Sequence, residues 1–157
     1  MVDPNARKST VVWQLFNYQR SRDLIRQFEE DCLQQTKKEN ETGISAPGNI
    51  SNPTLRGAML LLNPPKHVAM AQRWVKVIDR VWDEFREEDA VSGKEHGISY
   101  LFEKAYCLTG EPRAKGDNAK SKVEICEACH IAYRTFYSWL EKCIERTTYY
   151  AAKEGLI

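Results

Sequence analysis

The clearest pattern in the chain is a seam of apolar positions in the segment that follows Lys66. Apolar residues recur there at intervals of three and four, which is the spacing of one buried face of a helix. A face of this breadth is typical of a helix packed in a bundle rather than of an isolated coiled coil. The seam residues are Ala71, Trp74, Ile78, Val81 and Phe85, and Val75 and Trp82 widen it.

The same kind of spacing predicts three further helices in the first two thirds of the chain. The first covers residues 11–33, with Ser9 and Thr10 as candidate caps. The second starts at Pro53, because proline is favoured at the first position of a helix. The third has its apolar residues between positions 98 and 106.

Polar segments separate these helices. Residues 34–52 are rich in Gly, Asn, Ser and Pro and are expected to form a flexible loop. Asn63-Pro64-Pro65 should break the chain before the seam, and residues 108–121 read as a second long polar loop. No alternating strand pattern and no internal repeat occurs. We therefore expect an all-α protein in two parts, residues 7–90 and residues 91–157.

Bulk composition narrows the possible roles of the chain. It has 157 residues and a formal net charge of only +1, so nucleic-acid binding would need a local basic face. No apolar run reaches the length of a membrane span, and the first ten residues lack the apolar core of a signal peptide. The five cysteines form no even framework and are expected to be reduced. These features predict a cytoplasmic location.

The C-terminal segment SKVEICEACHIAYRTFYSWLEKCIE carries two helical patterns around a short break. Ser121 and Glu124 form an S-x-x-E capping box for a short first helix. His130 interrupts this helix, and a second one should start near Ala132. Two helices joined by a tight turn fit either a plain hairpin in a bundle or a helix-turn-helix, and the pattern alone does not separate them. Residues of the second helix at burial spacing are Phe136, Trp139, Leu140, Cys143 and Ile144.

This segment resembles the C-terminal helix-turn-helix of sigma-factor region-4-like regulators. It is most similar to the late-gene transcription regulators of tailed bacteriophages, of the RinA and ArpU type. Their first helix typically reads T-W-x-x-I-A-x-x-L-x-I, and their second reads S-x-R-T-x-Y-R-W. Upstream segments are similar more loosely, so only the terminal segment is specific. The matching positions are Ser121, Ile125, Cys126, Cys129 and Ile131 in the first pattern, and Ala132, Arg134, Thr135, Tyr137 and Trp139 in the second.

Two residues depart from the pattern of that family. His130 stands where the turn often has glycine, so a positive φ there would have a cost, although His tolerates it better than most residues. Ala132 replaces the usual capping serine, which should cost about 1 kcal/mol of helix stability. The segment from Thr109 to Ser121 is also longer than expected between the helices that it joins.

Cys126-Glu-Ala-Cys129-His130 is the one stretch that suggests metal chemistry. C-x-x-C followed by His resembles half of a zinc site or a haem attachment site. A second ligand pair at matching spacing is missing, and a buried free cysteine behaves as a small hydrophobe. We therefore expect structural cysteines, no metal and no cofactor. No phosphate-binding glycine loop or catalytic constellation occurs, and we expect no enzymatic activity.

The resemblance implies a sequence-specific DNA-binding regulator that acts with host RNA polymerase in a bacterial cell. Residues 91–157 would form the DNA-binding domain, and residues 7–90 would form a dimer or contact the polymerase. Tyr133, Arg134 and Ser138 would face base edges, because an arginine pairing with guanine is the commonest specific contact. A late-gene antiterminator and a DNA-packaging adaptor stay as alternatives. The expected phosphate contacts are Thr135, Tyr137, Lys142, Lys115, Lys120 and Lys122.

Overall fold

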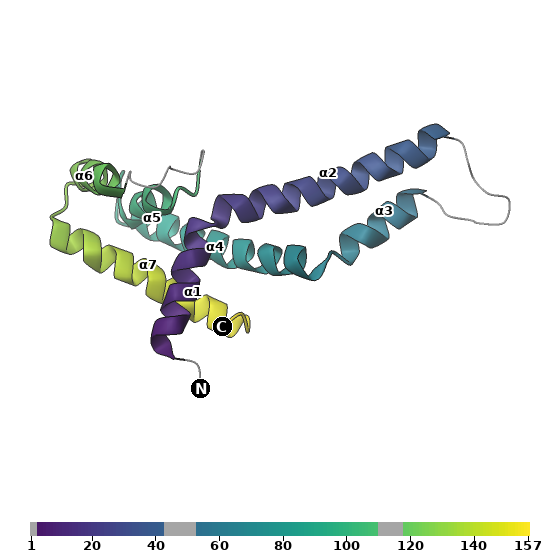
Figure 1. Ribbon diagram of the computed structural model, residues 1–157. Helices are drawn as coiled ribbons and strands as arrows, with labels where there is room; N and C mark the ends of the chain where they lie inside the picture. Colours follow the sequence, from purple (N-terminus) through teal and green to yellow (C-terminus); the bar gives the residue numbers. More distant parts are fainter. Residues whose placement is uncertain (1–2, 43–52, 110–117) are drawn as a thin grey trace. The chain divides into compact units, whose positions relative to one another are not determined.

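All regular structure in the described part of the chain is α-helical, which confirms the predicted all-α class (Figure 1). The computed structural model describes residues 3–42, 53–109 and 118–157, and side chains within residues 3–35, 57–109 and 122–157. The helices are α1 (Pro4–Phe16), α2 (Tyr18–Thr42), α3 (Pro53–Leu62), α4 (Lys66–Val91), α5 (Ile98–Tyr106), α6 (Asn118–Cys129) and α7 (Tyr133–Lys153).

The helices divide into two compact units, and the division runs through two of them. Unit 1 comprises residues 1–20 and 73–157, and unit 2 comprises residues 21–72. The first turn of α2 and most of α4 therefore belong to unit 1. Unit 1 takes residues from both sides of the predicted boundary at position 90. The assignment of different functions to residues 7–90 and 91–157 stays a prediction.

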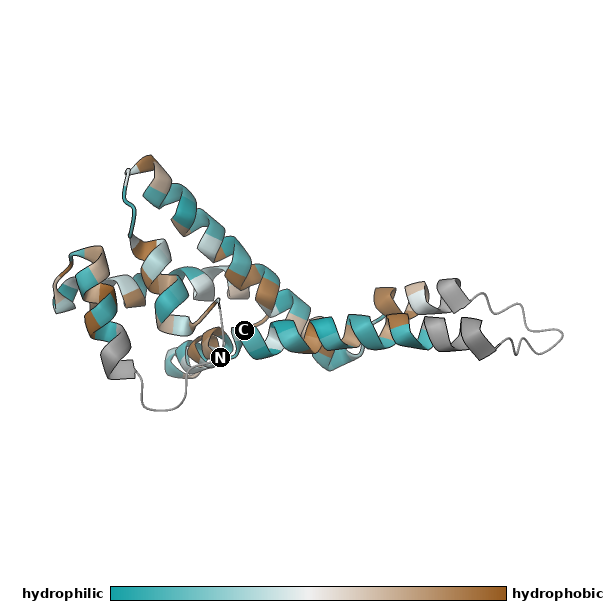
Figure 2. Cartoon of the chain, turned by 90° about the horizontal axis from the view of Figure 1, so that it is seen from above, coloured by the Kyte–Doolittle hydropathy of each residue, from teal (hydrophilic) through white to brown (hydrophobic). Residues whose placement is uncertain are grey.

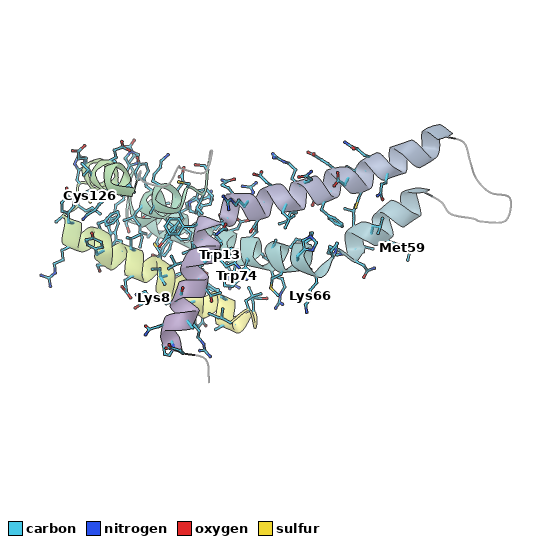
Figure 3. The ribbon with its side chains drawn as sticks, viewed as in Figure 1. Lys8, Trp13, Met59, Lys66, Trp74 and Cys126 are labelled. Carbon is cyan, nitrogen blue, oxygen red and sulfur yellow. The ribbon has the colours of Figure 1, made fainter. Side chains whose placement is uncertain are left out.

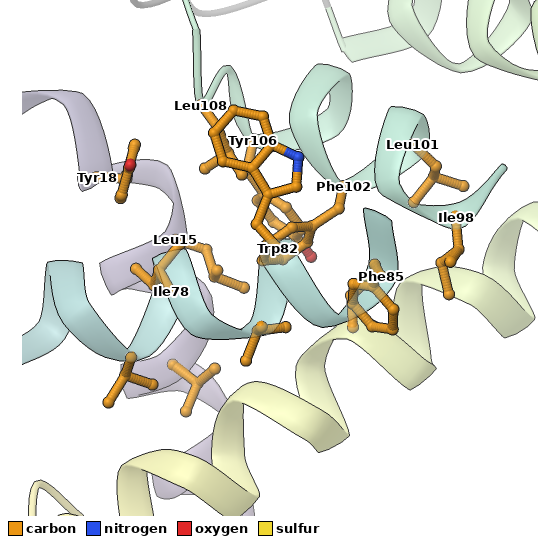
Figure 4. Close-up of a cluster of buried hydrophobic side chains, with 14 of the residues drawn as sticks. Leu15, Tyr18, Ile78, Trp82, Phe85, Ile98, Leu101, Phe102, Tyr106 and Leu108 are labelled. Atoms are coloured by element: carbon orange, nitrogen blue, oxygen red, sulfur yellow. The ribbon is translucent and has the colours of Figure 1, made fainter. Parts of the chain in front are cut away.

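The core of unit 1 is built on the predicted apolar seam of α4. Trp74, Ile78, Val81 and Phe85 are nearly inaccessible and pack in one cluster with side chains of α1, α5, α6 and α7. Figure 4 shows Phe85 and Trp82 of α4 facing the aromatic residues of α5. The rings of Phe85 and Phe102 meet edge to face, with their centroids 5.6 Å apart. The expected helix with apolar residues between 98 and 106 supplies this second wall, so both predictions are confirmed.

The N-terminal helix differs from its prediction at both ends. α1 begins at Pro4, where the Asp3 carboxylate accepts a hydrogen bond from the Asn5 N–H. Ser9 and Thr10 are therefore internal, and the Thr10 hydroxyl donates back to the Ala6 carbonyl at 2.9 Å instead of capping a helix. α1 packs across α7, so the first and last helices of the chain share one core.

α2 is longer than its apolar pattern indicated. It continues to Thr42, so residues 34–42 are helical and the prediction of a loop there is wrong. Gln, Lys and Glu dominate that stretch and have good helix propensity, which explains a helix without an apolar face. Residues 43–52, the rest of the predicted loop, lie outside the described residues. Two predictions are confirmed nearby: α3 begins at Pro53, and the Asn63-Pro64-Pro65 break separates it from α4.

Four helices of unit 1 end in the same way, on a residue with positive φ. In each case the N–H of the next residue bonds to the carbonyl five positions earlier, as in a Schellman motif. This geometry suits glycine, yet two of the four positions carry side chains. The residues are Gly93 after α4, Cys107 after α5, His130 after α6 and Gly155 after α7.

A carboxylate from α4 caps the start of α5. Asp89 is buried and accepts hydrogen bonds from the Ser99 N–H at 2.9 Å and from the Ser99 hydroxyl at 2.6 Å. Gly97, the N-cap residue, lies so close to this carboxylate that an added Cβ would overlap its oxygen atoms. Asp89 is therefore buried, whereas its sequence neighbours Glu87 and Glu88 are exposed.

Candidate nucleic-acid interface

The turn between α6 and α7 is three residues long and tightly bonded. His130 has φ +53°, its N–H bonds to the Glu127 carbonyl at 3.3 Å, and the Ile131 N–H bonds to the Cys126 carbonyl at 3.1 Å. Ile131 packs against the core and holds the turn in place. The expected positive φ at His130 is confirmed.

The two helices on either side of the turn differ from their predictions in one respect. α6 begins at Asn118, three residues before the predicted cap at Ser121, so Ser121 lies inside the helix. α7 begins at Tyr133 with Ala132 as its N-cap, as predicted, and no side chain caps it. The first turn of α7 consequently presents its backbone N–H groups without a capping oxygen from Ala132.

α7 has one face in the core and one face in solvent. Phe136 and Cys143 are buried, and Trp139 and Leu140 are partly buried against the same cluster. Trp139 was expected to be a core residue, and it is only partly buried. The Lys94 ammonium lies 5.5 Å from the centroid of its ring. The helix is anchored by α1 and α5, which both pack against it. Its opposite face over the first two turns is therefore free.

The residues predicted to read base edges lie on this free face. Tyr133 is 51% exposed, and Arg134 and Ser138 are exposed beside it. Tyr137 is 56% exposed and Lys142 is exposed, whereas Thr135 is half-buried. Lys142 lies 4.0 Å from Glu88, at the limit of an ion pair, so its charge is partly balanced. The structure thus places the predicted residues of α7 on neighbouring turns of this helix.

Lys122 of α6 reaches across to α7. Its ammonium donates a hydrogen bond to the Tyr137 hydroxyl at 2.7 Å and lies 4.3 Å from the Tyr133 ring centroid and 4.5 Å from that of Tyr137. The hydrogen bond to Tyr137 is the main cause that raises the pKa of Lys122. Of the other predicted phosphate contacts, Lys115 lies outside the described residues, and Lys120 lies in α6 with its side chain undescribed.

Acidic groups also lie on α7, beyond its first two turns. Glu141 pairs with Lys8 of α1 at 2.7 Å, and Glu145 follows one turn later. Positive charge therefore gathers at the N-terminal end of the free face and negative charge further along it. Lys94, which follows the end of α4, is a cation near Trp139 that sequence reasoning missed, because no motif marks it.

The cysteines of the C-x-x-C stretch are packing residues in this structure. Cys126 is buried in the core (labelled in Figure 3), and Cys129 packs partly against it, with its sulfur 3.9 Å from the Gly97 carbonyl oxygen. Burial raises the pKa of Cys126 and raises that of Cys129 to about 11, with Cys126 and Asp89 adding to the second shift. Within the described ranges no three His, Cys, Asp or Glu side chains gather as metal ligands would.

Two large aromatic residues, Trp13 of α1 and Tyr149 of α7, are exposed. Trp13 is 60% exposed because it lies opposite Val11 and Leu15 on α1. Tyr149 is exposed, whereas its neighbour Tyr150 packs against the core and donates to the Glu84 carboxylate.

Comparisons with protein-family models, with curated proteins and with solved structures found no match to this chain. None of the described helices combines the length and the apolar character that crossing a lipid bilayer requires. The conclusions about function therefore depend on the geometry of α6 and α7 and on the resemblance of their sequence.

Proposed function

We propose that this protein is a sequence-specific DNA-binding transcription regulator, of the kind that activates late genes of tailed bacteriophages together with host RNA polymerase. The observation that carries the proposal is the arrangement of α6, a three-residue turn and α7. Phe136 fixes α7 in the core while Arg134 and Ser138 face solvent on the opposite side. A short helix, a tight turn and a second helix with a free N-terminal face are the parts of a helix-turn-helix.

In this function the first two turns of α7 enter the major groove. Arg134 pairs with a guanine, and Tyr133 and Ser138 contact neighbouring base edges. Thr135, Tyr137 and Lys142 contact phosphates from α7, and Lys115, Lys120 and Lys122 add contacts from the segment before it and from α6. Lys122 has two further N–H groups beyond the one that it donates to Tyr137, so it can hold a phosphate and this tyrosine together.

The acidic residues further along α7 are compatible with this docking. A recognition helix contacts base edges with its N-terminal residues and then leaves the groove. Glu141 lies in the third turn and is already paired with Lys8. The near-neutral net charge of the chain makes such a local separation of charge necessary, because bulk attraction to DNA is absent.

Two other functions are compatible with the same fold. An antiterminator of the late-gene class would use this module while it travels with the elongating polymerase. A DNA-packaging or structural adaptor would use the helices for assembly and would leave the face of α7 unused. The exposed Arg134 favours the DNA-binding functions over the adaptor, because an adaptor gives no reason for a guanidinium at that position.

DNA footprinting on fragments of a phage genome tests the proposal. We expect protection upstream of a late promoter by the protein alone, and its loss with Arg134→Ala. Arg73→Ala is a matched control, because it removes an exposed arginine of unit 1 that bonds to the Glu154 carbonyl rather than facing outward from α7. Protection that requires polymerase and falls downstream of the promoter supports the antiterminator. An absence of protection on every fragment contradicts both DNA-binding functions.

The affinity for DNA should also fall steeply with salt. Each phosphate contact contributes roughly one unit to the slope of log affinity against log salt. Lys122→Ala should lower that slope by about one unit without a change of preferred sequence.

A further inference from the structure

Unit 2 exposes more large hydrophobic side chains than it buries. It consists of residues 21–72, a helical hairpin of α2 and of α3 with the start of α4. Among its described side chains, Cys32, Val68 and Ala71 are the buried ones. Figure 2 colours part of α3 as hydrophobic. The exposed residues are Leu24, Leu33, Met59, Leu60, Leu61, Leu62 and Met70.

The sequence predicts that residues 7–90 form a dimer or contact the polymerase. The faces in that range with the clearest apolar spacing are the seam of α4 and the apolar residues of α1. The structure buries both in the core of unit 1, where Val11, Leu15 and Phe85 are fully inaccessible. Neither face is therefore available to a partner, and most of the exposed Leu, Met and Val side chains that the structure describes belong to the hairpin.

Exposed residues of opposite charge lie on two helices of the hairpin, and we call Glu29, Glu30 and Leu33 of α2 the acidic ridge and Lys66 with Met70 of α4 the basic ridge. On α2, Glu29 lies one turn before Leu33, and Glu30 is next to it. On α4, Lys66 lies one turn before Met70. Glu29, Glu30 and Lys66 have no ion-pair partner among the described side chains. Figure 3 shows Met59 and Lys66 extending from α3 and α4 on the side away from α2. The acidic ridge and the basic ridge are thus separate surfaces of one hairpin.

We propose that the exposed face of unit 2 binds a second copy of this chain. In a two-fold dimer, a surface of one protomer can contact a different surface of its partner. Symmetry then repeats the same contact with the roles of the two protomers exchanged. The acidic ridge of α2 then faces the basic ridge of α4 in the partner, with the leucines of α3 buried between them. Two hairpins together form a four-helix arrangement, which hides apolar faces that one hairpin leaves open.

A second copy fits this surface better than an unrelated protein for one reason. The two ridges are complementary to each other in charge, and both have an aliphatic residue one turn from the charged one. A second hairpin carries the opposite charge for both ridges at once, so one two-fold contact matches both.

Sedimentation equilibrium of the full chain without DNA tests the association. We expect a dimer at tens of micromolar and a rise in its dissociation constant of about tenfold or more with Leu62→Glu. Leu62 is 79% exposed, so this change should leave the protomer folded, as circular dichroism will check. The control is Val91→Glu, because Val91 is 90% exposed at the end of α4 in unit 1 and should leave the constant unchanged.

A charge exchange tests the identity of the partner. Lys66→Glu alone, and Glu29→Lys with Glu30→Lys alone, should each weaken self-association because like charges then meet twice in the dimer. An equimolar mixture of the two variants should associate as the unchanged protein does. A monomer at every concentration, or a mixture no stronger than its components, overturns the proposal. The measurement needs no DNA, so its outcome is separate from that of the footprinting.

Discussion

Arg134 and Phe136 lie two residues apart on opposite sides of α7, and this separation makes the proposed interface testable with two substitutions. Arg134→Ala should cost about 1–3 kcal/mol in binding to the cognate site, with much less effect on non-specific binding. It should change the free energy of unfolding by less than about 0.5 kcal/mol, because the side chain is exposed. Competition binding and urea denaturation measure the two effects.

Phe136→Ala is the counterpart of that experiment. Phe136 is buried, so its truncation should lower the free energy of unfolding by about 3–5 kcal/mol. Trp139 is a poorer probe of the core because it is only partly buried. If Arg134→Ala destabilised the protein as much as Phe136→Ala, the assignment of the outward face would be wrong.

Position 97 requires glycine because the Asp89 carboxylate lies close to it, and not because of its own backbone angles. Gly97→Ala should lower the free energy of unfolding by roughly 2 kcal/mol or more, because the new methyl group meets the buried Asp89 carboxylate that caps α5. The same substitution in an Asp89→Ala background should cost much less, since the overlapping atoms are gone. Equal costs in both backgrounds, measured by chemical denaturation, would show that the contact is unimportant.

At the scale of the elements, helices that end on a positive φ differ in the residue type that adopts it. α4 and α7 end on glycines with positive φ, while α6 ends on His130 with the same geometry. His130→Gly should raise the stability by about 0.5–1 kcal/mol, because relief of the strained backbone exceeds the entropy that glycine adds to the unfolded chain. The melting temperature measures this effect. Gly93→His is the reverse change and should lower it by a similar amount.

Helices were predictable wherever burial follows a local repeat. The spacing of Trp74, Ile78 and Phe85 predicted the buried face of α4, and Pro53 marked the start of α3. Ends without such signals were missed. The Asp3-Pro4 cap lies outside the apolar repeat of α1, and the polar end of α2 is helical through propensity alone.

The candidate site was predictable only in part. The spacing of Phe136 and Cys143 placed the outward residues of α7 correctly. The contact of Lys122 with Tyr133 and Tyr137 depends on how α6 meets α7, and no local pattern encodes it. The burial of Asp89 has the same cause, because its partner Ser99 belongs to the next helix.

At the scale of the whole of unit 1, its buried titrating groups predict a loss of stability in alkali. Burial raises the pKa of Cys126, of Cys143 and of Tyr106, and raises that of Cys129 to about 11. Thiols of the unfolded chain ionise near pH 8.5, so above that pH the unfolded state releases protons that the folded state retains. Stability should therefore be intact below about pH 8.5 and should fall up to about pH 11.

Urea denaturation at several alkaline pH values measures this fall. Cys129→Ala should make it shallower, because it removes one of the retained protons. Cys32→Ala is the comparison, since Cys32 belongs to unit 2 and should leave the slope of unit 1 unchanged. A free energy of unfolding that stays flat up to pH 11 would contradict the assignment of these thiols to the core.

The packing of α1 against α7 has a consequence for the order in which the protein folds during synthesis. Val11 and Leu15 leave the ribosome before α7, and the surface that covers them includes α7. Contacts between residues so far apart in sequence form late, because the intervening chain must be closed into a loop. The nascent chain therefore carries an uncovered apolar helix until α7 has been made, and chaperones that bind such segments should bind α1 during that time.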